Sequence, residues 1–329
     1  MSPEPSIAEK VLLDPVLSAC PLPLRARFYP LGFPLDLETN SADVMQAATE
    51  GWGLFPQAFD EPPMRLSLGV AEGENRAIPP KSKFFSREHL MSLTANSENF
   101  VVMDFKQNYA FGWVNPAVAA DHPVLRYRFL STAMLTMVEQ LALTPLHCAL
   151  VARNGCGVAL FGDSFAGKST LAYACARVGW TFLSDDGTHL LRKSSDRYAI
   201  GDPYAMRFRE DAKTLFPELA NRLVFARPNG KIGIEVLTHE LPIVTAPGCS
   251  IEHLVFLNRK EAGAARLQHY SKADAMAWCE QYVAFGTAEV RAAQLACYQR
   301  LLGAGVWELH YSDFDGAIAR LEQLVDSGA

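Results

Sequence analysis

Apolar and polar positions alternate most regularly in the middle third of the chain. Residues 146–151 and 157–161 form two apolar runs, which Arg153-Asn154-Gly155 separates. An Asn-Gly pair between such runs predicts a β-hairpin, because both residues tolerate the left-handed backbone of a two-residue turn. The sequence therefore predicts two antiparallel strands joined near Asn154 and Gly155.

The second of these strands leads into a loop and then a helix. Residues 169–178 are rich in alanine and leucine, and Gly179 follows them as a helix-ending residue. A further apolar run, residues 179–184, ends in Asp185 and Asp186. A strand–helix–strand unit of this length is typical of a right-handed βαβ crossover. We therefore expect the two carboxylates near the loop end of a pair of parallel strands.

The first part of the chain shows weaker patterns. Residues 65–70 alternate like a half-buried strand, and residues 99–105 and 109–114 flank a turn-like segment, which predicts a second hairpin. Residues 124–143 predict a long helix. One face of that helix would carry the apolar residues Leu125, Phe129, Ala133, Met137 and Leu141.

These patterns divide the chain into three parts. Residues 1–24 are expected to form a tail or a short helix, and residues 25–120 an α+β domain of unknown role. Residues 121–329 form the third part, which contains the hairpin, the loop that follows it at residues 162–168 and the predicted helix. Its C-terminal third is expected to be helical, with Ser271 as the N-cap of one helix.

The composition is that of a folded globular protein. Of 329 residues, 49% are hydrophobic and 20% are charged, and the net charge is −6. This balance argues against nucleic acid or an anionic membrane as the main partner. The seven cysteines have neither zinc-site nor disulfide spacing, which favours a reducing compartment. Asp14 and three prolines interrupt the apolar run 11–24, so we expect no signal peptide, no membrane span and a cytoplasmic location.

Residues 162–169 read Gly-Asp-Ser-Phe-Ala-Gly-Lys-Ser, a Gly-x-x-x-x-Gly-Lys-Ser pattern. Two glycines allow a tight bend that presents backbone N–H groups to phosphate oxygens, and the helix that follows adds its positive end. Lys168 suits the β- and γ-phosphates, and Ser169 suits Mg²⁺. We predict that ATP, or another phosphoryl donor, and Mg²⁺ bind here. The predicted nucleotide-binding residues are Gly162, Asp163, Ser164, Phe165, Ala166, Gly167, Lys168, Ser169 and Thr170.

Phosphoryl transfer also needs a metal ligand and a group that takes the proton of the attacking hydroxyl. Asp185 and Asp186 could fill these roles, although such a pair can also cap a strand end. His147 lies at the start of the first strand of the predicted hairpin. Such a residue is often a core or edge histidine, but a histidine near a carboxylate can also orient it and tune its protonation. His189 lies in an apolar strand and is expected to be structural.

Several positive side chains could stabilise the charge of a transferring phosphate, or could simply be solvated at the surface. They are Arg207, Arg209, Arg227, Lys231 and Arg259. Arg207 is favoured, because it follows the Asp202-Pro203-Tyr204 turn shortly after the two aspartates.

The resemblance to a known family rests on His147, the loop at residues 162–169 and the Asp185-Asp186 pair. Together they resemble the catalytic core of the HPr kinase/phosphorylase family, which has an upstream histidine, a Gly-Asp-Ser loop and an Asp-Asp strand end at similar spacing. The resemblance is specific from about residue 146 to 190, suggestive to residue 329 and absent over residues 1–120. It implies an α/β fold with a mixed β-sheet, the P-loop variant shared with phosphoenolpyruvate carboxykinases. It also implies phosphorylation of a serine hydroxyl. By this resemblance, Asp185 would accept the serine proton, Asp186 would support Asp185 and the metal ion, and His147 would assist.

The chain departs from the family at Phe165 and Thr170, where glycine and glutamate are usual, and the family's later glycine-rich stretch is not evident. Three functions stay open. The first is a kinase acting on a hydroxyl of a protein, peptide or small molecule; the second is a nucleotide-binding regulatory module with weak or no phosphoryl transfer. The third, a transport-type ATPase, is disfavoured because no Leu-Ser-Gly-Gly-Gln-like segment follows. The family resemblance suggests a homo-oligomer.

Overall fold

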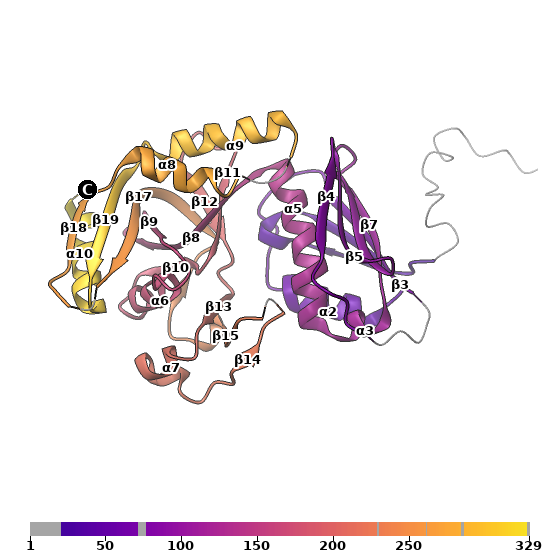
Figure 1. The fold of residues 1–329 in the computed structure, drawn as a ribbon, viewed down its shortest axis with the longest axis horizontal. Coiled ribbons are helices and arrows are strands. Elements are labelled where there is room, and N and C mark those ends of the chain that lie inside the picture. The colour runs from indigo at the N-terminus through magenta and orange to yellow at the C-terminus, as the bar shows by residue number, and fades with distance from the viewer. Residues whose placement is uncertain (1–20, 72–76, 229, 261, 284–285, 328–329) are drawn as a thin grey trace, which may run out of the picture. The chain divides into compact units, whose positions relative to one another are not determined.

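A computed structural model describes residues 21–71, 77–228, 230–260, 262–283 and 286–327 (Figure 1). Within them, the chain divides into two compact units, one ending at Met137 and the other beginning at Val138. The division lies inside helix α5 (Ser131–Leu141), whereas the sequence placed it between residues 120 and 121. The tail expected at residues 1–24 falls largely outside the described residues.

The N-terminal unit contains a seven-stranded sheet in the order β1-β2-β3-β7-β6-β5-β4. Its strands are β1 (Leu24–Phe28), β2 (Leu35–Thr39), β3 (Met64–Val70), β4 (Lys83–Arg87), β5 (Leu90–Asn96), β6 (Asn99–Asp104) and β7 (Tyr109–Val114). β3 pairs in parallel with β2 and β7, and the other pairs are antiparallel. The predicted hairpin is confirmed, with Asp104 opposite Tyr109.

The helices of this unit have polar N-caps. Ser41 caps α2 (Ala42–Trp52), Asn115 caps α3 (Pro116–Ala120) and Asp121 caps α4 (His122–Leu125). A π-helical turn, η2 (Arg126–Leu130), connects α4 to α5, so residues 122–141 are helical without interruption. The helix predicted over residues 124–143 is confirmed as far as Leu141, and Leu143 begins a strand. A 3-10 turn, η1 (Pro30–Gly32), lies between β1 and β2.

The C-terminal unit contains a nine-stranded sheet and a small three-stranded sheet in the described residues. The large sheet consists of β8 (Leu143–Arg153), β9 (Cys156–Phe161), β10 (Thr181–Ser184), β11 (Gly187–Leu191), β12 (Tyr198–Gly201), β16 (Val244–Thr245), β17 (Gly248–Arg259), β18 (Arg266–His269) and β19 (Gly305–Tyr311). The small sheet has the order β13-β15-β14, with β13 (Ala205–Phe208), β14 (Phe225–Ala226) and β15 (Ile232–Leu237). Both parallel and antiparallel pairs occur, so the expected mixed α/β class is confirmed.

The helices of this unit cover both faces of the large sheet. They are α6 (Lys168–Arg177), α7 (Ala212–Leu215), α8 (Lys272–Glu280), α9 (Ala288–Leu301) and α10 (Phe314–Ser327), with 3-10 turns η3 (Pro217–Leu219) and η4 (Thr238–Glu240). One core cluster joins residues of α6 and α10 to the sheet, and a second joins residues of α8 and α9. No helix in the described part of the chain is both long enough and apolar enough to cross a bilayer.

The β8–β9 hairpin has the predicted turn. Asn154 and Gly155 have φ values of 53° and 80°, the left-handed conformation that such a turn requires. The expected adjacent pair of parallel strands does not form, because β8 lies between β9 and β10 and is antiparallel to both. Residues 150–152 of β8 pair with β9 along one edge and with β10 along the other, so β8 separates the two strands.

β10 and β11 lie one after the other along the same edge of β8. Ser184 of β10 pairs with Leu150, and Gly187 of β11 pairs with His147. Asp185 and Asp186 therefore occupy the break between two strands that share a neighbour. We call these two residues the acidic turn.

The sequence suggested that the C-terminal third is helical, but this part of the chain also contains strands. Strand β19 pairs in parallel with β17 along seven residues, from His253 opposite Gly305 to Arg259 opposite Tyr311. Leu309 and Tyr311 are buried in the core cluster that contains α6 and α10, and Val306 is buried in the cluster that contains α8 and α9. β19 is thus an internal strand of the large sheet, between β17 and β18.

Candidate functional site

The loop that joins β9 to α6, residues 162–167, depends on its two glycines; we call it the glycine loop. A Cβ atom at Gly162 would lie 2.6 Å from that of Ala166, and one at Gly167 would lie 2.9 Å from Oη of Tyr311. Gly167 also has a φ of 91°, which L-residues rarely adopt. Tyr311 donates a hydrogen bond of 3.1 Å to the Ala166 carbonyl. The loop is therefore closely packed and held from β19.

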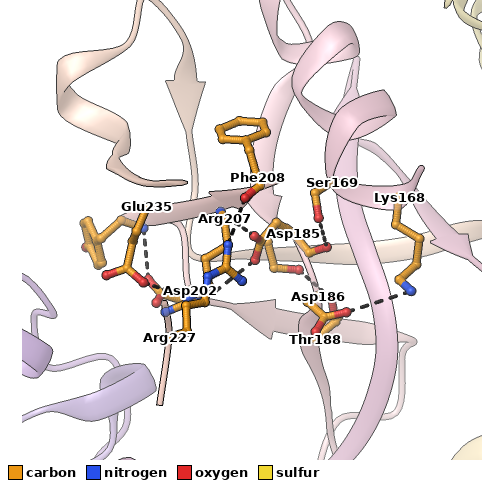
Figure 2. Close-up of polar contacts among 12 residues, drawn as sticks. Lys168, Ser169, Asp185, Asp186, Thr188, Asp202, Arg207, Phe208, Arg227 and Glu235 are labelled. Atoms are coloured by element: carbon orange, nitrogen blue, oxygen red, sulfur yellow. Dashed lines mark hydrogen bonds and ion pairs between the residues drawn. The ribbon is translucent and has the colours of Figure 1, made fainter. Parts of the chain in front are cut away.

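Lys168, the first residue of α6, directs its ammonium group back over the glycine loop. Nζ donates to the Gly162 carbonyl at 2.7 Å and lies 3.3 Å from Nε2 of His147 and 3.9 Å from Oδ1 of Asp186. Figure 2 draws the contact with Asp186. Burial lowers the pKa of this ammonium group, and the nearby Asp186 opposes that shift. One cation thus connects the glycine loop, the histidine and the acidic turn.

His147 lies on β8 opposite the residue that follows the acidic turn. Its Nδ1 atom is 3.3 Å from Oδ1 of Asp186, and its ring stacks on Tyr282 with centroids 5.1 Å apart. Burial lowers the pKa of this imidazole, while Asp186 raises it. With Lys168 donating to Nε2, the proton of the neutral ring is placed on Nδ1, where it faces Asp186.

The two aspartates of the acidic turn have different environments. The Asp186 side chain is 55% exposed and faces Lys168 and His147, whereas the Asp185 side chain is 5% exposed. Oδ2 of Asp185 accepts a hydrogen bond of 2.7 Å from the backbone N–H of Arg207. Burial raises the pKa of Asp185 to about 6, although Arg207 opposes the shift.

Hydrogen bonds hold the acidic turn in place. Oγ of Ser169 donates to the Asp185 carbonyl at 3.3 Å, which connects the start of α6 to the turn. Ser184 and Thr188 flank the turn and share a hydrogen bond of 2.6 Å between their hydroxyls. Thr188 also donates to the Cys148 carbonyl of β8 at 3.0 Å. The turn therefore has a defined position relative to the glycine loop.

Arg207 lies on β13 and contacts the buried aspartate from the small sheet (Figure 2). Its Nη1 atom is 4.0 Å from Oδ1 of Asp185, and its Nε atom donates to Glu235 at 3.0 Å. Burial also raises the pKa of Asp202, with Arg207 opposing. Arg227 donates to the Phe208 carbonyl at 3.0 Å, and burial, with Arg207 nearby, lowers its pKa.

The structure thus brings most of the predicted site residues together. Lys168, Ser169, His147, Asp186 and Asp185 are joined by the contacts above, with Arg207 attached through Asp185. Asp163, Ser164 and Phe165 are exposed on the glycine loop, and Ala166, Gly167, Ser169 and Thr170 are half-buried. His189 lies apart and, as expected, is buried, 3.4 Å from Glu139.

Sequence reasoning missed the residues that support the site. Tyr282 stacks on His147, Glu235 holds Arg207, and Tyr311 holds the glycine loop. No local motif marks the first two. Tyr311 ends the alternating stretch 305–311, and that alternation could have revealed a buried strand leading to the site. Of the other predicted cations, Arg259 lies over the ring of Phe314, 5.5 Å from its centroid.

Comparison with models of known protein families finds no match, and no curated protein matches. Among solved structures, the chain matches the HPr(Ser) kinase/phosphatase from Coxiella burnetii. The match has 11% sequence identity and a TM-score of 0.28, and it covers 56% of this chain and 98% of that chain. A likeness this weak carries no argument about function. The finer assignment to that family's fold stays a prediction.

Proposed function

We propose that the C-terminal unit is an ATP- and Mg²⁺-dependent kinase that phosphorylates a serine-type hydroxyl of a protein, peptide or small molecule. The observation that carries the proposal is the position of Lys168. Its ammonium group contacts the glycine loop, His147 and Asp186 at once. Phosphoryl transfer needs mainly positioning and charge stabilisation, and this arrangement offers both.

The glycine loop and α6 would bind the phosphates. A loop too tight for a Cβ at Gly162 or Gly167 lets backbone N–H groups approach phosphate oxygens closely. The N-terminal end of the ten-residue helix α6 favours the same negative charge. Lys168 already lies at this point. Its closer partners are a carbonyl and an imidazole, and its anionic partner, Asp186, is 3.9 Å away.

The Ser169 hydroxyl lies beside the acidic turn, and hydroxyl and carboxylate oxygens are ligands that suit Mg²⁺. When bound, the ion would neutralise charge on the transferring phosphate. Ser169 and a carboxylate of the acidic turn would hold the ion. No cluster of three or more His, Cys, Asp or Glu side chains suited to a metal occurs among the described residues. Mg²⁺ does not require one, because it is commonly bound through one or two carboxylates together with substrate phosphates.

We assign Asp186 as the general base that accepts the proton of the attacking hydroxyl, whereas the family resemblance implies Asp185 for this role. A general base must be within reach of the hydroxyl, and the Asp186 side chain is 55% exposed where that of Asp185 is 5% exposed. The hydroxyl gives its proton to Asp186, and its oxygen forms a bond to the terminal phosphorus. The bond from that phosphorus to the bridging oxygen breaks and releases the nucleoside diphosphate. His147, 3.3 Å away, orients the carboxylate.

A second candidate is a nucleotide-binding regulatory module with weak or no phosphoryl transfer. The exposed Phe165 ring favours it, because a bulky side chain in the glycine loop narrows the approach of an acceptor. This candidate requires the same nucleotide site. It differs in expecting no labelled product.

The test uses the full chain in two steps. Calorimetry with ATP, with and without Mg²⁺, should show Mg²⁺-dependent binding to the protein and weaker binding to Lys168→Ala. Incubation of the protein with γ-labelled ATP and a cell lysate should then transfer label to an acceptor, and Asp186→Asn should transfer far less. Uptake without label in any acceptor would favour the regulatory module. No uptake at all would exclude both candidates.

A further inference from the structure

Two arginines at the C-terminal end of β13 have different partners. Arg207 is paired with Glu235 at 3.0 Å and lies 4.0 Å from Asp185. Arg209, two residues later, is exposed, and its guanidinium has no hydrogen bond or ion pair within the described part of the chain. Its contact is the ring of Phe165, whose centroid lies 3.3 Å from Cζ. Arg209 is thus a free cation placed against the glycine loop.

Phe165 is unusual in both backbone and exposure. Its φ is 81°, a left-handed conformation that is costly for a bulky residue, and its side chain is 73% exposed. On its C-terminal side, Ala166 donates to the Asp163 carbonyl and accepts from Tyr311, so the backbone is held from both directions. The loop therefore keeps an aromatic ring directed outward, with an arginine on its face.

We propose that Arg209 is a mobile phosphate-binding arginine and that the Phe165 ring is its resting position. The proposal rests on the proposed function and deepens it. When the terminal phosphate of a nucleoside triphosphate lies in the glycine loop, the Arg209 guanidinium leaves the ring and binds phosphate oxygens. A stacking contact at an exposed site is weaker than charge-assisted, bidentate hydrogen bonds to phosphate, so the exchange is favourable.

Arg207 is not suited to this movement. If its guanidinium moved to a phosphate, the Glu235 and Asp185 carboxylates would lose their positively charged partner, and Asp185 is buried. Arg207 therefore positions the acidic turn, while Arg209 loses only a stacking contact. The arginine favoured from the sequence and the arginine free to bind phosphate are two different residues.

The test measures binding of Mg²⁺-ATP and Mg²⁺-ADP by calorimetry to the full chain and to three variants, Arg209→Ala, Phe165→Leu and the double variant. Arg209→Ala should weaken ATP binding about 10-fold and leave ADP binding within about 2-fold, because a charged contact to the terminal phosphate is lost. Phe165→Leu retains the Cβ atom and hence the backbone strain, but removes the ring. It should strengthen ATP binding about 3-fold, and this gain should vanish in the double variant.

Arg266→Ala, which removes an exposed arginine on β18, serves as the matched control and should leave both affinities unchanged. Equal ATP affinity of Arg209→Ala and the parent protein would overturn the proposal. An equal effect of Phe165→Leu with and without Arg209 would overturn the resting role of the ring. Either result leaves the proposed function standing, whereas a parent protein that binds no Mg²⁺-nucleotide removes both.

Discussion

The Nζ atom of Lys168 lies 3.9 Å from Oδ1 of Asp186, and the His147 ring contacts both residues. The lysine comes from the start of α6 and the aspartate from the break between β10 and β11. Strand β8 pairs with both β10 and β11 and carries the histidine. The sheet therefore brings a cation, an imidazole and an accessible carboxylate to the edge of the glycine loop.

Lys168→Ala should weaken Mg²⁺-ATP binding at least about 10-fold, because a buried, charge-assisted contact to phosphate is lost. Calorimetry measures the affinity. Lys272→Ala, an exposed lysine at the start of α8, is the control and should bind ATP like the parent protein. Unchanged affinity in Lys168→Ala would contradict the phosphate role of this residue.

Asp186→Asn should lower the rate of phosphoryl transfer about 10²- to 10⁴-fold, the usual cost of losing a positioned base. ATP affinity should change much less, because the amide has nearly the same size. Asp185→Asn is the matched comparison, since its side chain is 5% exposed and cannot reach an acceptor in this conformation. Label transfer from ATP measures both rates. A larger loss in Asp185→Asn would return the role of base to that residue.

The contribution of Asp185 to the stability of the protein should decline as the pH rises from about 4 to about 6. Burial raises the pKa of Asp185 from its ordinary 3.8 to about 6. The unfolded chain loses this proton at lower pH than the folded protein does. Between the two values the folded state binds more protons, and its stability therefore falls with rising pH.

Asp185→Asn isolates this effect, because the amide oxygen can still accept from the Arg207 N–H. Relative to the parent protein, the variant should gain about 2 kcal/mol in free energy of unfolding between pH 4 and pH 8. Urea denaturation at the two pH values measures the difference. A difference that does not change with pH would show that Asp185 ionises in the folded state as it does in the unfolded chain.

Arg207→Ala should destabilise the protein by about 1–2 kcal/mol at pH 8, because the buried Asp185 carboxylate loses its nearby positive charge. This value allows for the 40% exposure of the arginine side chain. The effect should shrink at pH 5, where Asp185 is largely protonated. Arg222→Ala, which breaks the exposed pair with Glu240, is the control and should cost less than about 1 kcal/mol at either pH. Denaturation curves that shift equally for both variants would contradict the pairing of Arg207 with Asp185.

Local sequence was sufficient for features that depend on neighbouring residues. Asn154 and Gly155 form the predicted turn because both adopt the left-handed backbone. The glycines at 162 and 167 and the apolar run after Lys168 predicted a bent loop followed by a helix, and both are present. Ser271 caps α8 as expected, accepting from the Asp274 N–H. In each case the deciding contact spans only a few residues, so it is encoded in one short segment.

Tertiary structure alone decided which side chains are accessible and which are paired. Nothing in the Asp-Asp pair distinguishes its members; burial beside β13 separates the enclosed Asp185 from the open Asp186. Likewise, the sequence favoured Arg207 over Arg209 as the arginine that binds phosphate, but Arg207 is held by Glu235 of β15, whereas Arg209 lies on the Phe165 ring. Burial and ion pairing depend on residues brought from distant parts of the chain, and their effects on charge are set by that three-dimensional environment. The sequence thus determined the turns, the loop and the helix that follows it, whereas folding assigned the roles of the charged residues around them.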